Sequence, residues 1–407
     1  MSQDVAGAVA AYRNRVGPGV LAALTRAAAR VPALASRLTA AGVDPQAPVG
    51  IDALSSVPVL GKDDLVEAQR ADPPFGGLVA AEAPIERVFQ SPGPLYEPQL
   101  AGPDPWRWAP ALAAAGIGAG DTVLNCFGYH LSPAGAMFEL GCLALGARVV
   151  PGGIGNQDLQ VHAIATAGVT GYTGLPSYLK VLLDRFEAGV TEGAWPSSSW
   201  GLRTALVTAE PLPASLRTEL QRRVPVVRMA YGTAEAGLIA YERGAGRPLR
   251  PADGLLVEVC DLSTGVPVTQ GEGQVVVTLA RPDYPLVRFG TGDLSAWVVD
   301  EEGQACLAGV LGRVGQAVKV RGMFLHPRQA AEVLTGVPGL KVWRLVVDRH
   351  EHRDELRCEV VIEDGAAAGE VAVAVADRIR SGLRFTAEVV PVAQVATPGE
   401  LADVRTW

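Results

Sequence analysis

The 407-residue sequence has few cysteines, no long apolar run and no basic leader segment. Its five cysteines are odd in number, widely scattered and without a C-x-x-C pair, which argues against a disulfide framework or a zinc site. The longest apolar stretches, such as 141–150, fall far short of the ~20 residues that span a bilayer. No basic start followed by an apolar core opens the chain, so no signal peptide is predicted. We therefore expect a cytoplasmic protein with no membrane partner.

Charge is also scarce, and its balance is acidic. Charged residues make up 19% of the chain, the formal net charge is -8, and no block of Lys and Arg occurs. This composition argues against a nucleic-acid partner, because such binding depends on cations placed against phosphates. It does not exclude an anionic ligand in a locally positive pocket.

What the sequence does contain, between residues 121 and 208, is an alternation of short apolar runs with helical spacing. Alternation of this kind predicts parallel βαβ layering. Before it, Val20, Leu21, Leu24 and Ala28 share one face of an expected helix, which is a candidate homodimer surface. The expected strands are 122–127, 147–150, 169–173 and 202–208, and the expected helices are 134–145, 159–167 and 178–188.

The character of the chain changes after residue 231. Strands at 255–261 and 273–279, separated by Gly/Pro-rich turns, indicate an antiparallel or barrel-like section. A further break near 312 precedes a compact α+β pattern. The predicted class is α/β, with a large domain at 1–311 and a small, mobile C-terminal domain at 312–407. The small domain is expected to contain helices 327–334 and 369–382 and strands 342–348, 356–363 and 387–392.

Three segments carry candidate chemistry, although each also has a structural explanation. In 229–237 (MAYGTAEAG), a Gly permits close backbone approach to a phosphate, and Glu235 is a candidate Mg²⁺ ligand; a strand-end turn is the alternative. In 285–293 (PLVRFGTGD), Arg288 is a candidate phosphate partner and Asp293 a candidate acceptor for ribose hydroxyls; a β-turn is the alternative. In 311–322 (LGRVGQAVKVRG), cations flank alternating valines, as in a charged edge strand.

In this order the three segments resemble the adenylate-forming enzyme family, and specifically its phenylacetate–CoA ligase branch. The resemblance covers nearly the whole chain. It includes 54–65 (LSSVPVLGKDDL), the Gly-rich 146–155, 175–178 (LPSY), 208–211 (TAEP) and 323–327 (MFLHP).

The resemblance implies a role for each matching residue. Glu235 would ligate Mg²⁺, Lys319 would serve thioester formation, and Tyr129 would line the acyl pocket. The expected nucleotide-binding residues are Ser91 and Gly93 in the phosphate loop, Glu210, Pro211, Ala230, Tyr231 and Gly232 around the adenine, Thr233 beside the α-phosphate, Asp293 on the ribose and Arg313 at the domain junction.

The sequence departs from the family in two places. The phosphate loop, here 90–98 (QSPGPLYEP), lacks the family's Thr pair and Lys, and its prolines at 92 and 94 offer no N–H. Glu97 near the expected Lys would repel the β- and γ-phosphates unless a metal intervened. At the C-terminus Asp403 and Arg405 remain, but the Lys that precedes them in the family is absent. Losing one electrostatic stabiliser typically lowers the rate by ~10²–10³.

The function implied is activation of a carboxylic acid, expected to be aryl or arylacetic, through an acyl-adenylate to an acyl-CoA thioester. ATP, Mg²⁺ and coenzyme A are the cofactors implied. The alternative is a nucleotide- or acyl-adenylate-binding homologue with weak or only half-reaction activity, and the two departures are its support.

Overall fold

The structure is a computed structural model, in which the chain forms two compact units, Met1–Gly312 and Arg313–Trp407. Among the described residues, no helix combines the length and apolarity needed to cross a membrane. The described residues are 4–48, 50–91, 95–314, 318–321, 323–325, 327–350 and 353–405.

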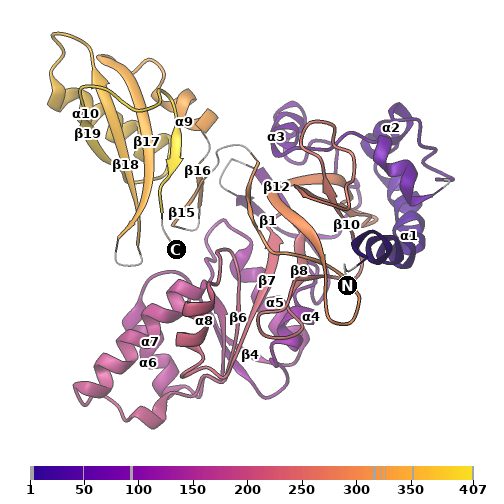
Figure 1. Cartoon of the computed structure of the whole chain (residues 1–407), viewed down its shortest axis with the longest axis horizontal. Coiled ribbons are helices and arrows are strands. Elements are labelled where there is room, and N and C mark those ends of the chain that lie inside the picture. The colour runs from indigo at the N-terminus through magenta and orange to yellow at the C-terminus, as the bar shows by residue number, and fades with distance from the viewer. Residues whose placement is uncertain are drawn as a thin grey trace. The chain divides into compact units, whose positions relative to one another are not determined.

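A seven-stranded sheet forms the centre of the first unit (Figure 1). Its strands are β3 (Thr122–Asn125), β4 (Arg148–Val150), β5 (Gly171–Gly174), β6 (Thr204–Val207), β7 (Val226–Thr233), β8 (Gly237–Tyr241) and β9 (Arg250–Pro251). They lie in the order β4-β3-β5-β6-β7-β8-β9. The strands from β4 to β7 are parallel, and β8 and β9 are antiparallel to their neighbours. The predicted βαβ layering is confirmed.

Helices cover both faces of this sheet. Successive strand residues point to opposite faces, so Val123 packs in one apolar cluster and Leu124 in another. The cluster around Val123 takes in α4 and α5, and the cluster around Leu124 takes in α6, α7 and α8. The helices of the unit are α1 (Val5–Arg30), α2 (Pro32–Ala40), α3 (Lys62–Ala71), α4 (Ala109–Ala114), α5 (Ala134–Ala144), α6 (Gln157–Thr166), α7 (Pro176–Thr191) and α8 (Ala214–Leu220), with 3₁₀ turns η1 (Ile51–Ser56) and η2 (Ser197–Ser199).

A second, antiparallel sheet contains the long strand β12. It is built from β10 (Leu256–Cys260), β11 (Glu272–Leu279), β12 (Leu286–Val299) and β13 (Ala305–Leu307). Residues 291–293 of β12 form a bulge against β11, because Gln274 pairs with Leu294 and Val276 already pairs with Gly290. Gly292 sits in this bulge at φ +80°, a conformation that favours glycine. The Gly-rich segment is therefore a bulge inside a strand, where the sequence also allowed a turn.

A two-stranded hairpin, β1 (Ile85–Ser91) and β2 (Leu95–Leu100), carries the segment predicted as the phosphate loop. The short strand β14 (Gly312–Arg313) ends the first unit and begins the second.

The second unit has its own sheet and apolar core. The strand order is β19-β18-β17-β20, and the core includes Leu345, Cys358, Val375 and Leu401. Its elements are β15 (Val318–Val320), β16 (Met323–Leu325), α9 (Pro327–Leu334), β17 (Leu340–His350), β18 (Arg353–Ile362), α10 (Ala368–Arg378), the π-helical turn η3 (Ile379–Leu383), β19 (Glu388–Pro391) and β20 (Leu401–Asp403). The predicted α/β class is confirmed.

Candidate active site

Three predicted site residues lie at the ends of parallel strands of the central sheet. Tyr129 comes after β3, Glu210 comes after β6, and Thr233 ends β7. Because parallel strands end at the same edge of a sheet, these residues lie along one edge, where α/β sheets bind their ligands. The fold thus brings together residues that are up to about a hundred positions apart in the sequence.

Two of the motifs meet directly. The hydroxyl of Tyr231, on β7, donates a hydrogen bond of 2.9 Å to Oδ2 of Asp293, on β12. Both side chains are buried, at 6% and 4% exposure. The bulge at 291–293 sets the direction of the Asp293 side chain, and the backbone N–H of Asp293 donates to Thr291 Oγ1. The link joins the central sheet to the antiparallel sheet at the site.

Glu235 lies in the turn between β7 and β8 and is 2% exposed. Burial is the largest influence and raises its pKa, but the charge and hydrogen bond of Lys62, together with hydrogen bonds from the backbone and Thr233, hold the pKa below its usual value. Lys62 Nζ lies 2.9 Å from Glu235 Oε1. The other oxygen, Oε2, is buried and accepts no hydrogen bond from the residues that the structure describes. Glu235 is therefore an ionised carboxylate, and one of its oxygens is paired with Lys62.

Two partly buried arginines hold the turn that carries Glu235. Arg107 Nη2 donates to the carbonyl oxygens of Ala236 and Leu238, at 3.0 and 2.8 Å, and Arg281 Nη2 donates to that of Ala236 at 3.1 Å. Burial lowers the pKa of both guanidinium groups, that of Arg107 to about 9. Positive charge therefore lies at this turn although the chain as a whole is acidic.

The donor set around Glu235 fits a magnesium ion that is completed by substrate oxygens. Mg²⁺ is commonly held by one or two carboxylates together with substrate phosphates and water. Glu235 Oε2 is a buried oxygen without a hydrogen-bond partner in the described ranges. Within those ranges no group of three or more His, Cys, Asp or Glu could hold a metal by itself.

Glu97 corrects one expectation from the sequence. It lies on β2, is 1% exposed, and its Oε2 accepts a 3.1 Å hydrogen bond from the Tyr284 hydroxyl. Burial, followed by the charge of Glu235, raises the pKa of Glu97 to about 8. The carboxyl group is mostly protonated at neutral pH, so the predicted repulsion of phosphates by Glu97 is wrong. The strand pairing of the hairpin turns this side chain into the interior.

The other phosphate-loop residues are only partly visible. Ser91 ends β1, is buried, and its hydroxyl donates to the carbonyl of Leu95 across the hairpin at 3.4 Å. Gly93 lies outside the described residues. The role of both in nucleotide binding stays a prediction.

The residues expected around the adenine are positioned by strand ends. Glu210 accepts a 2.6 Å hydrogen bond from the backbone N–H of Ser177, in the first turn of α7, and Pro211 beside it is exposed. Ala230 is buried within β7. At Gly232, a Cβ would meet the Gly237 carbonyl oxygen at 2.4 Å, so the β7–β8 hairpin itself requires glycine.

Tyr129 is held by the strand that precedes it. Its hydroxyl accepts a 2.8 Å hydrogen bond from Asn125 Nδ2, which also donates to the carbonyl of Gly135. Burial, and then the neighbouring Glu139, raise the pKa of the Tyr129 hydroxyl. The ring is therefore a neutral, half-buried surface at the sheet edge, and its place in an acyl pocket stays a prediction.

Arg288, predicted as a phosphate partner, has a structural role instead. Its side chain is 1% exposed. It donates to the carbonyl oxygens of Ser55 and Val57 at 2.8 Å, and its Nε lies 3.3 Å from Glu258 Oε2. A guanidinium that is buried among these partners cannot meet a nucleotide, so this prediction is wrong.

The remaining candidates belong to the second unit. Arg313 lies in β14, and Lys319 lies in β15, where its backbone pairs with that of Phe324; the Lys319 side chain is outside the described atoms. Arg405 forms ion pairs with Asp403 at 2.5 Å and with Asp354 at 3.1 Å. The catalytic roles of Arg313 and Lys319 stay predictions.

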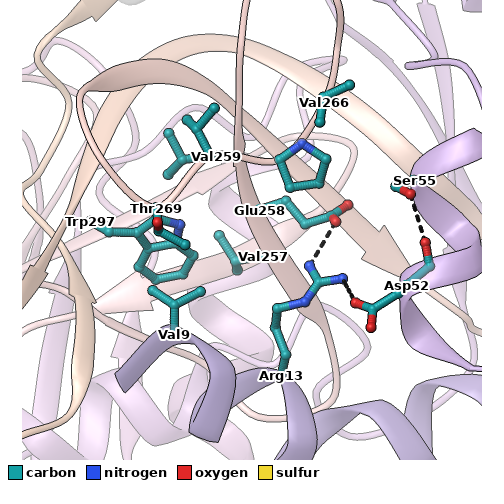
Figure 2. Close-up of a pocket in the computed structure, with 12 residues that line it drawn as sticks. Val9, Arg13, Asp52, Ser55, Val257, Glu258, Val259, Val266, Thr269 and Trp297 are labelled. Atoms are coloured by element: carbon teal, nitrogen blue, oxygen red, sulfur yellow. Dashed lines mark hydrogen bonds and ion pairs between the residues drawn. The ribbon is translucent and has the colours of Figure 1, made fainter. Parts of the chain in front are cut away.

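A pocket of about 310 Å³ lies elsewhere in the first unit (Figure 2). None of the predicted site residues lines it. Figure 2 shows Arg13 between Glu258 and Asp52, with ion-pair distances of 2.9 and 2.8 Å. These are contacts that hold α1 and η1 to β10.

The expected homodimer surface is also corrected. Val20, Leu24 and Ala28 are buried in the core of their own unit. The apolar face of α1 therefore packs within the chain and is not available to a second copy.

Sequence reasoning missed the side chains that surround Glu235. Lys62 was noted only as part of a family-like segment, and Arg107 and Arg281 carried no motif. The signal for Lys62 was its position at the first residue of a helix, where a cation opposes the helix dipole. Nothing in the sequence indicated that Arg107 and Arg281 meet at one carbonyl group.

Comparisons with known proteins agree with this geometry. The model of the AMP-binding enzyme family matches residues 107–279. A phenylacetate–coenzyme A ligase from Thermus thermophilus is 30% identical over 359 residues, which are 82% of this chain and 78% of that protein. The phenylacetate–coenzyme A ligase of Escherichia coli is 26% identical over 360 residues, 84% of this chain and 80% of that protein.

Among solved structures, a 2-hydroxyisobutyryl-CoA ligase in complex with 2-HIB-AMP and CoA shares the fold. Its TM-score is 0.83 at 24% identity, and the match covers 96% of this chain and 90% of that one. The chain belongs to the AMP-binding family of adenylate-forming enzymes, in the branch of the phenylacetate–CoA ligases.

Proposed function

We propose that this protein is an AMP-forming acid–CoA ligase. It activates a carboxylic acid with ATP, through an acyl-adenylate, and transfers the acyl group to the thiol of coenzyme A. ATP and coenzyme A are both cytoplasmic metabolites, which accords with a cytoplasmic location.

The observation that carries this proposal is the hydrogen bond between Tyr231 and Asp293. It brings the two nucleotide motifs together at the edge of the parallel sheet, and the ionised Glu235 lies in the turn just beyond. A structural turn at either motif would not require these two buried polar groups to meet.

The chain's own residues supply positioning and charge. Asp293 accepts hydrogen bonds from the ribose, Tyr231 orients Asp293, and Thr233 and Glu235 lie on the phosphate side. Mg²⁺, when held at Glu235, neutralises phosphate charge during attack by the carboxylate. Lys319 and Arg313 act from the second unit, with Lys319 serving thioester formation.

The acid is proposed to be aryl or arylacetic. The two curated relatives are named for phenylacetate. The half-buried ring of Tyr129 follows β3 at the sheet edge and offers a flat apolar surface for an aromatic acid.

A second candidate is a homologue that performs only the thioester half-reaction. The altered loop favours it, since the hairpin contributes a neutral Glu97 where the family has a lysine. Without that cation, pyrophosphate departure is less well stabilised.

A paired assay separates the candidates. Purified protein is incubated with ATP, Mg²⁺, coenzyme A and a panel of aryl, arylacetic and short-chain acids, and both pyrophosphate and acyl-CoA are followed. The ligase gives both signals with the same acid, and D293A loses both. Acyl-CoA formed only from a pre-made acyl-adenylate identifies the half-reaction enzyme.

A further inference from the structure

The phosphate loop of this chain has no cation of its own. In the described part of the hairpin, the position expected to hold a lysine is occupied by Glu97, which points into the interior toward Tyr284. A polyphosphate at this edge of the sheet still needs a cationic hydrogen-bond donor, because its charge is too high to be left to neutral groups.

Lys62 is a cation beside this edge. It is the first residue of α3, and its Nζ lies 2.9 Å from Glu235 Oε1. Glu235 is almost fully buried, whereas the Lys62 side chain is 27% exposed, so the lysine faces the solvent side of the pair. The sequence has only four lysines among its 35 Lys and Arg residues, so a lysine at any given basic position is uncommon in this chain.

Helix stability does not explain the position of Lys62. A cation in the first turn of a helix opposes the positive end of the helix dipole. Asp64, in the same turn, already caps the helix by accepting a 2.7 Å hydrogen bond from the Gly61 N–H. The position of Lys62 is therefore explained by the groups beyond the N-terminus of α3, where Glu235 lies.

The charges around Lys62 favour an anionic ligand. Arg107 and Arg281, both partly buried, donate to the Ala236 carbonyl in the turn that follows Glu235. One ionised carboxylate, Glu235, pairs with Lys62 beside this turn. An anionic group that approaches Glu235 therefore meets the ammonium group of Lys62 on Oε1.

We propose that Lys62 is the phosphate-binding cation of this enzyme and replaces, from α3, the lysine that the loop lacks. The inference rests on the proposed function, because it concerns the β- and γ-phosphates of ATP. Lys62 donates to phosphate oxygens that AMP does not have. The rival explanation is that Lys62 only neutralises the buried Glu235.

The test compares the affinities of ATP and AMP in EDTA, so that metal binding at Glu235 does not contribute. Calorimetric titrations use the full chain as wild type, K62M, K62R and K180M. Lys180 is the matched control, since it is also a paired lysine of the first unit, 2.6 Å from Asp184. If Lys62 binds phosphate, K62M lowers the ATP-to-AMP affinity ratio about 10- to 100-fold, the range of one charge-assisted hydrogen bond. K62R recovers part of that loss, and K180M leaves the ratio unchanged.

A second pair of variants keeps the test valid if K62M fails to fold. In K62M/E235Q no buried charge is left without its partner, and E235Q alone is its reference. An ATP-to-AMP affinity ratio that is 10- to 100-fold lower in K62M/E235Q than in E235Q supports the proposal. An unchanged ATP-to-AMP ratio in both comparisons overturns it while leaving the ligase function intact. A wild-type protein that binds neither nucleotide, both in EDTA and with Mg²⁺, overturns both.

Discussion

Replacing Glu97 by Gln should remove a pH-dependent loss of stability from this protein. The folded-state pKa of Glu97 is about 8, whereas the usual value is 4.5. Between these values the folded protein holds a proton that the unfolded chain has released. Stability is therefore unaffected below about pH 4.5, falls by ~1.4 kcal/mol per pH unit up to about pH 8, and stays low above it. The full loss is on the order of 5 kcal/mol.

Gln is neutral at every pH and its carbonyl can still accept the hydrogen bond of Tyr284, so E97Q lacks this loss. Urea unfolding of both proteins is followed by tryptophan fluorescence from pH 5 to pH 9, which reports on the buried Trp106 and Trp108 of the same unit. The stability of E97Q relative to wild type should rise steadily with pH and level off near pH 8–9. E86Q, which removes an exposed carboxylate from β1, controls for net charge. A constant difference between E97Q and wild type at all pH values would refute the reasoning.

Three further substitutions test individual contacts. R288M leaves the buried Glu258 with Arg13 as its remaining cation and deprives the carbonyl oxygens of Ser55 and Val57 of their donor. It should lower the unfolding free energy by about 1–3 kcal/mol with an unchanged ATP-to-AMP affinity ratio; a normal urea midpoint with weakened ATP binding would restore the phosphate role. G232A forces a Cβ against the Gly237 carbonyl oxygen and should lower the free energy of unfolding by about 1–3 kcal/mol. G19A, which adds a Cβ in open space on α1, should not destabilise the protein. Equal melting temperatures for the two variants would contradict the packing account. Y231F removes the hydrogen bond to Asp293 and should raise the KM for ATP about 10-fold; an unchanged KM would mean that Asp293 needs no support from Tyr231.

The sequence predicted the parallel sheet well because its signals are local. Each strand there is a short apolar run between helices, and β3, β5 and β6 are buried along their whole length. The segment 286–299 was harder, since its glycines indicated either a turn or a site. Only the pairing with β11 makes it a strand with a bulge.

The site was predicted less completely, because burial changes the role that a charged side chain can have. Glu97 and Arg288 were both interpreted as facing phosphates, and both lie in the interior among partners far away in the sequence. Lys62 is 173 positions before Glu235, so their ion pair left no local pattern. Residue types and motifs identified the family, but the roles of these charges depend on contacts that only the fold creates.

The most direct test of the central claim is acid-dependent exchange of labelled pyrophosphate into ATP, because it isolates the adenylation half-reaction that the altered loop puts in question. With an aryl or arylacetic acid, Mg²⁺ and no coenzyme A, the wild-type protein should show exchange. In E235A the exchange rate should be about 10²–10³-fold lower. Absence of exchange with every acid, in a protein that still binds AMP, would contradict the claim that this chain activates its own substrate.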